Sequence, residues 1–182
     1  MSNVHRYRRG ETNPIQLATS ATYPVEIGDL CFRNPADSKT VRPAGSMADQ
    51  LSAALNRDTF RQHFAGVCLQ KIGLQSGEVS FQLHPRPDAA VLATEGEFEF
   101  DCDSTVWYPG DLVGVCENAG GTALLPQKVV KVTSYAEAVA VAVPEANCIG
   151  VARTTVNVRL FATKFDGGVM TPTSGAASSG TP

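Results

Sequence analysis

Residues 97–116 read EFEFDCDSTVWYPGDLVGVC, and this stretch decides the fold class. Residues 97–101 alternate acidic and aromatic side chains, the period-two pattern of a strand with one wet face and one buried face. Pro109, Gly110 and Asp111 form a turn signal, and residues 112–117 are a second run of β-forming residues. A strand, a turn and a second strand in such close succession predict β structure.

The same pattern of short strands and turn residues continues on both sides of this stretch. Short strands are expected within residues 17–43. Further candidate strands are residues 66–71, 78–83, 89–93, 97–101, 112–117, 128–132, 138–142, 147–152 and 155–162. Regular strands separated by turn signals are typical of sandwiches and barrels and not of βαβ units. We therefore expect a mainly β chain, folded as an antiparallel β-sandwich or β-barrel.

One helix is predicted, over about residues 46–62. Ser46 can cap its N-terminus, and Asp49 three residues later completes a capping-box arrangement. Apolar residues recur at approximately helical spacing through Phe60, and the helix is expected to end near His63. The predicted organisation is an extended arm at 1–16, a β-rich domain at 17–162 with the helix inserted, and a flexible Gly/Ser/Thr/Pro tail at 163–182.

Two phrases recur in the chain. Tyr23-Pro24 is followed by Gly28-Asp29-Leu30, and Tyr108-Pro109 is followed by Gly110-Asp111-Leu112. A strand that begins after a Gly-Asp turn explains both phrases. They are too short to establish an internal duplication.

Composition excludes several classes of function. The chain has 182 residues and a net charge of −3, so no basic surface is expected to recruit nucleic acid. Charged residues make up 18%, below the usual share of about 25%, which suits a protein packed against partners. No apolar run approaches the length needed to span a membrane, and no signal peptide is present, so we expect folding in the cytoplasm.

The sequence predicts no catalytic residues, no cofactor and no metal site. The five cysteines are widely spaced without a CxxC pair, and the three histidines lack metal-ligand spacing. The row Glu95, Glu97, Glu99, Asp101 and Asp103 is interpreted as the solvated face of an edge strand, with cation binding or acid–base chemistry as the alternative. The chain is therefore not expected to be an enzyme.

Five residues are candidate contact residues. Arg6, Arg8 and Arg9 carry the charge of the N-terminal arm, which is either a frayed terminus or an arm that reaches a neighbouring subunit. Trp107 and Tyr108 precede the Pro-Gly-Asp turn. They are either a core anchor or an interface hot spot, since Trp and Tyr dominate binding energy at interfaces.

Several stretches together resemble the capsid decoration, or cement, proteins of tailed bacteriophages. They are ATYPVEIGDL at 21–30 with TVRPA at 40–44, FRQHFAGV at 60–67, EGEFEFDC at 95–102 with YPGDLVG at 108–114, LPQKVV at 125–130, CIGVAR at 148–153 and VNVRL at 156–160. These are turns and strands, and it is their order over residues 20–162 that carries the resemblance. The helix and the C-terminal tail do not match a motif of the family.

The resemblance implies a structural virion protein on the outer surface of the capsid, made in the cytoplasm of the host bacterium. Its partners would be the major capsid protein, whose subunits it bridges, and itself, with a homotrimer favoured. No nucleic acid, membrane or cofactor is implied. A phage tail or fibre protein and a carbohydrate-binding β module, with Trp107 and Tyr108 as a stacking platform, remain the alternatives.

Overall fold

The computed structural model describes residues 7–20, 22–37, 39–72 and 89–161. Its strands are β1 (Tyr7–Arg9), β2 (Ile15–Thr19), β3 (Leu30–Arg33), β4 (Thr40–Pro43), β5 (Phe64–Ile72), β6 (Ala89–Ala93), β7 (Glu97–Val106), β8 (Leu112–Glu117), β9 (Leu124–Val132), β10 (Ala140–Ala142) and β11 (Ala152–Leu160). The α-helix is α1 (Ala53–His63), and η1 (Ala44–Ser46) and η2 (Ala146–Cys148) are short 3-10 helices.

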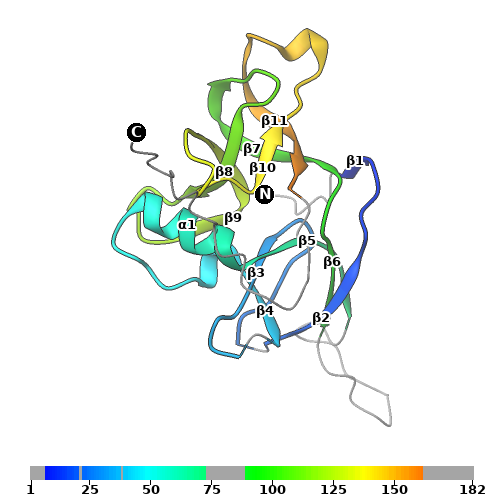
Figure 1. Cartoon of the computed structure of the whole chain (residues 1–182), viewed down its shortest axis with the longest axis vertical. Coiled ribbons are helices and arrows are strands. Elements are labelled where there is room, and N and C mark those ends of the chain that lie inside the picture. Colours follow the sequence, from blue (N-terminus) through cyan, green and yellow to red (C-terminus); the bar gives the residue numbers. More distant parts are fainter. Residues whose placement is uncertain (1–6, 21, 38, 73–88, 162–182) are drawn as a thin grey trace, which may run out of the picture.

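The strands form two small barrels, which lie one above the other in Figure 1. The N-terminal barrel has the closed strand order β2-β4-β3-β5-β6, and the C-terminal barrel has the order β7-β11-β10-β8-β9, closed by a β7–β9 pairing. The prediction of a mainly β chain is confirmed, and barrels rather than a sandwich are formed. The expectation of purely antiparallel sheets is wrong, because β2–β4 and β7–β9 pair in parallel.

The two barrels share one topology and one register. Strands β2 to β6 correspond in order to β7 to β11, and each pairing within one barrel has its counterpart in the other. Examples of counterpart pairs are Ala18–Thr40 and Asp101–Lys128, Gln16–Val91 and Glu99–Asn157, and Cys31–Gly66 and Val113–Ala140. Counterpart positions on the inner faces are Ile15 and Phe98, Leu17 and Phe100, Cys31 and Val113, Val41 and Val129, Ala90 and Val156, and Leu92 and Val158. The described part of the chain therefore contains a structural repeat, in which the barrel is the repeating unit.

The recurring Gly-Asp phrase occupies the same place in both barrels. The turn at residues 28–29 exchanges two backbone hydrogen bonds with Cys68 of β5, at 2.8 and 2.9 Å. The turn at residues 110–111 exchanges the same two bonds with Ala142 of β10, at 2.9 and 2.8 Å. Both glycines are left-handed, with φ of 91° and 88°, a conformation that glycine adopts without steric cost. The two sequence phrases therefore form structurally equivalent turns, each hydrogen-bonded to the corresponding strand.

The aspartate side chains of these turns also act alike. Asp29 Oδ2 accepts a hydrogen bond from the backbone N–H of Glu26 at 2.8 Å, and Asp111 Oδ2 accepts one from that of Tyr108 at 2.8 Å. Such a bond to the residue three places earlier fixes the entry of the chain into the following strand. The Asp in each phrase therefore sets where β3 and β8 begin.

A common hydrophobic core joins the barrels through the helix. Phe60 of α1 is fully buried, and its ring lies 5.9 Å from that of Phe32 and 5.7 Å from that of Phe64. The same cluster continues into the C-terminal barrel through Phe98 and Trp107. Because one cluster spans both barrels, the described residues pack as a single unit.

The helix is shorter than predicted at its N-terminus. It begins after Ser52, whose side chain accepts from the N–H of Leu55, and not after Ser46. Ser46 Oγ instead donates to the carbonyl of Pro43 at 2.8 Å. Leu51 has a φ of 69°, and this left-handed residue interrupts any helix that starts earlier. The predicted end near His63 is confirmed.

Four other predictions concern two strands and the two ends of the chain. Residues 147–152 are not a strand, because η2 and a turn through Gly150, with φ of 75°, occupy most of them. The described part of the predicted arm contains β1, which pairs with β7, and the start of β2. The predicted strand at 78–83 and the tail at 163–182 lie outside the described residues.

Candidate functional site

Trp107 and Tyr108 have different environments. Trp107 is 2% exposed, and its Nε1 donates to Cys102 Sγ at 3.4 Å. Trp107 is thus a core residue of the chain, and its ring offers no open face for a stacked sugar. Tyr108 is 52% exposed. Only Tyr108 of this pair lies on the surface where a partner can contact it.

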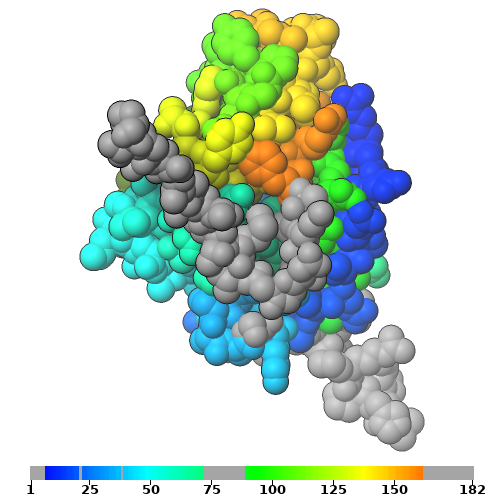
Figure 2. All heavy atoms as spheres, in the orientation of Figure 1, coloured from blue at the N-terminus to red at the C-terminus, as the bar shows by residue number. Residues whose placement is uncertain are grey.

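Two further exposed apolar side chains lie on the loop next to Tyr108. Ile149 is 41% exposed and Val151 is 47% exposed. The N–H of Gly150, between them, contacts the carbonyl of Trp107 at 3.5 Å, which brings this loop against the β7–β8 turn. The two loops meet at the top of Figures 1 and 2, at the far end of the C-terminal barrel. We call Tyr108, Ile149 and Val151 the apical patch.

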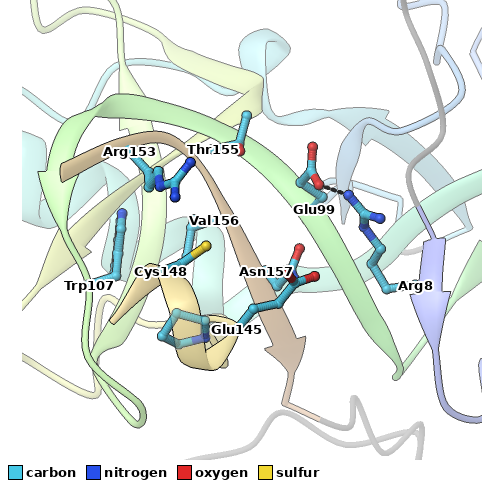
Figure 3. Close-up of a pocket in the computed structure, with 10 residues that line it drawn as sticks. Arg8, Glu99, Trp107, Glu145, Cys148, Arg153, Thr155, Val156 and Asn157 are labelled. Atoms are coloured by element: carbon cyan, nitrogen blue, oxygen red, sulfur yellow. Dashed lines mark hydrogen bonds and ion pairs between the residues drawn. The ribbon is translucent and has the colours of Figure 1, made fainter. Parts of the chain in front are cut away.

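A small pocket opens beside this patch. It has a volume of about 150 Å³, and β1, β7, η2 and β11 form its walls. Figure 3 shows Trp107 and Cys148 on one side of it and Arg8 with Glu99 on the other. The structure therefore brings two of the predicted contact residues, Arg8 and Trp107, to one hollow. The sequence did not indicate this pocket, because residues 147–152 were expected to form a strand, although Gly150 is a turn signal.

Arg8 and Arg9 bind carboxylates of their own chain. Arg8 pairs with Glu99, and Arg9 pairs with Glu97, which Arg159 Nη2 also contacts at 2.6 Å. Burial tends to raise the pKa of Glu97, but the hydrogen bonds from Arg9 and Arg159 outweigh it, so the pKa lies below its usual range. These ion pairs hold β1 on β7. Arg6 lies outside the described residues.

The acidic row on β7 is not the face of an edge strand. β7 pairs with β11 on one side and with β1 and β9 on the other. Glu97 is buried, and Asp103 accepts from Lys128 Nζ at 2.6 Å. Several carboxylates of the row therefore meet cations of neighbouring strands. Within the described ranges, no group of three His, Cys, Asp or Glu residues could hold a metal ion.

The cysteines are free, and most are buried. Burial raises the pKa of Cys68 to about 12 and raises that of Cys31 well above its ordinary value. Such thiols are protonated at neutral pH and pack as small apolar side chains. Cys148 is half-buried at the pocket wall, and its Sγ lies 3.3 Å from Asn147 Oδ1.

Comparison with known proteins gives no match, either to a protein-family model or to a curated protein. In the part of the chain that the structure describes, no helix is long and apolar enough to cross a membrane.

Proposed function

We propose that this chain is a structural virion protein that binds the outer surface of a tailed-phage capsid and bridges its major capsid protein subunits. The sequence resemblance supplies the identity of the partner. The observation that carries the proposal is the apical patch, where Tyr108, Ile149 and Val151 are exposed on two loops. Backbone hydrogen bonds connect these loops to each other and to β10. Exposed apolar side chains on adjacent loops provide surface that a protein partner can bury.

The patch is held in place by the barrel beneath it. The turn that follows Tyr108 is hydrogen-bonded to Ala142 of β10, and the buried Trp107 ring lies directly before Tyr108 in the chain. Lys131 Nζ lies 5.6 Å from the centre of the Tyr108 ring and 2.6 Å from Asp111 Oδ2. A side chain that is already ordered loses little conformational entropy on binding, so more of its contact energy contributes to affinity.

Binding to the assembled shell stabilises it by mass action. A protein that binds neighbouring subunits together, but not separated subunits, shifts the equilibrium toward the closed lattice. Contacts from several copies of a homotrimer raise the effective concentration of each remaining contact. The two barrels share one hydrophobic cluster, so a restraint on one barrel is also a restraint on the other.

The test uses purified shells that lack the protein and measures how much added protein they retain. Tyr108→Ala is expected to weaken binding at least tenfold, because a central tyrosine at an interface contributes about 2 kcal/mol or more. Its folded stability should change by no more than about 0.5 kcal/mol, as for other exposed positions. Tyr135→Ala is the matched control, since Tyr135 is 70% exposed, stacks on Phe161 and is not a member of the apical patch.

Two outcomes would contradict the proposal. One is shells that retain none of the unaltered protein, and the other is a Tyr108→Ala protein that binds as well as Tyr135→Ala. The number of copies in purified virions separates the shell from the tail: hundreds of copies indicate the shell, whereas a few to tens indicate a tail or fibre.

A further inference from the structure

The structural repeat shows that corresponding strand edges are covered differently in the two barrels. In the C-terminal barrel, β9 covers β7 only at residues 101–102, and β1 pairs with the same edge at residues 97–98. In the N-terminal barrel, β4 likewise covers β2 only at residues 18–19. Among the described strands, none pairs with the remaining part of that edge. β1 thus occupies an edge position on β7, and no described strand occupies the corresponding edge position on β2.

Side-chain burial follows this difference. Phe98 and Phe100 of β7 are 2% and 4% exposed, and Tyr7 of β1 covers Phe98 with its ring centre 5.7 Å away. Their counterparts Ile15 and Leu17 point into the N-terminal barrel but are only half-buried. A bulky side chain placed over Ile15, as Tyr7 is placed over Phe98, would remove this apolar surface from water.

The backbone of β2 presents hydrogen-bonding groups on this side. The carbonyl of Gly96, next to β7, accepts a hydrogen bond from the N–H of Leu160 in β11. The backbone N–H and C=O groups of every second residue from 96 onward therefore point toward β11, and those of residues 97 and 99 point toward β1. Gln16 is the counterpart of Glu99, and it is exposed. Its N–H and C=O therefore point away from β6, along the outer edge of β2.

The charges of the two edges select different occupants. β7 offers Glu97 and Glu99 to the arginines of β1, whereas β2 has Pro14 and Gln16 at the counterpart positions. The arginines of β1 from a second copy would find no corresponding carboxylates there, and they already have partners within their own chain. The occupant that fits this edge is an extended segment without charge, recognised through its backbone as in strand addition.

We propose that the outer edge of β2, centred on Gln16, receives an extended, uncharged segment of the major capsid protein, with a bulky apolar side chain over Ile15. This inference rests on the proposed function and adds a second contact to it. The apical patch belongs to the C-terminal barrel and this edge to the N-terminal barrel, so the two contacts lie on different halves of the chain. A protein held at both could restrain two places on the shell.

The decisive variant is Gln16→Pro. Proline removes the one N–H that points toward the incoming strand, and proline is tolerated on an edge strand because no bond to β6 is lost. Gln16→Ala is the control, because it removes the same side chain and keeps the N–H. On shells that lack the protein, Gln16→Pro is expected to bind at least tenfold more weakly than Gln16→Ala, with both variants melting at similar temperatures.

Hydrogen exchange on the unaltered protein gives a second measurement that does not depend on how the proline variant folds. Shell binding is expected to slow exchange at the Gln16 amide at least tenfold. Equal binding by the two variants, or unchanged exchange at Gln16 in shell-bound protein, overturns the strand addition alone. Shells that retain no unaltered protein overturn the proposed function together with it.

Discussion

The two barrels have the same strand order and register but very different interiors. The N-terminal barrel encloses small or medium side chains, among them Val41, Cys68 and Ala90, whereas the C-terminal barrel contains Phe98 and Trp107. The register is therefore set by features that both share, which are the Gly-Asp turns and the alternation of inner and outer residues. Side-chain size varies within that frame, because volume can be redistributed when the pattern is kept.

The largest expected effect distinguishes the two interiors. Trp107→Ala should destabilise the chain by about 3–5 kcal/mol, since it removes a large buried ring and its contacts. Val41→Ala, at a fully buried position of the N-terminal barrel, should cost about 2 kcal/mol because fewer atoms are lost. Denaturant unfolding of the two variants measures the difference. Equal losses would mean that the smaller interior is as sensitive to cavities as the larger one.

The repeated turns provide a second, smaller contrast. Asp29 is buried, and its Oδ1 also accepts from Gln127 Nε2 of β9 at 2.9 Å, so it links the two barrels. Asp29→Ala should therefore cost about 2–3 kcal/mol, because it leaves buried donors without an acceptor. Asp111→Ala should cost about 1 kcal/mol, since the groups it leaves can reach water. Unfolding free energies give the comparison, and the reverse order would contradict the assigned roles.

The smallest effect concerns the ion pairs of β1. The lowered pKa of Glu97 means that its stabilising contribution is present above the ordinary value of 4.5 and is lost as the pH falls through the folded pKa. Exchange protection of β1, corrected for the intrinsic rate, should fall a few-fold between pH 6 and the acid limit of folding. Glu97→Gln should abolish this dependence. A pH dependence that persists in the variant would assign it to another group.

Much of the fold could be predicted because it depends on local patterns. The strands Ala89–Ala93 and Leu112–Glu117 were bounded correctly by their turn residues, and alternation on β7 gave the correct inner face. The parallel pairings could not be predicted, since they join segments with no local signal for each other. The predicted helix start is wrong because Ser46 and Ser52 both fit a cap, and the extended Met47 and the left-handed Leu51 exclude the earlier start.

The candidate site was predicted less well. Trp107 and Tyr108 are neighbours in sequence and both follow the end of β7 at Val106, but Trp107 is buried and Tyr108 is exposed. The sequence predicts a strand through Ile149 and Val151 because both are β-forming residues, but the chain turns at Gly150. The sequence predicts Arg8 and Arg9 as charged contact residues, but the carboxylates that they bind lie on β7, far along the chain. Sequence spacing alone does not reveal such distant partners.

The shared core has a consequence for biosynthesis. The N-terminal barrel has all its strands once Ala93 has left the ribosome, but Leu30, Phe32 and Phe60 pack in a cluster that includes residues of β7 to β11. During translation, which proceeds at about 5–20 residues per second, several seconds pass before the residues of β7 to β11 that pack on those side chains are synthesised. The nascent protein therefore passes through an interval in which an apolar face is open to chaperones or to premature association.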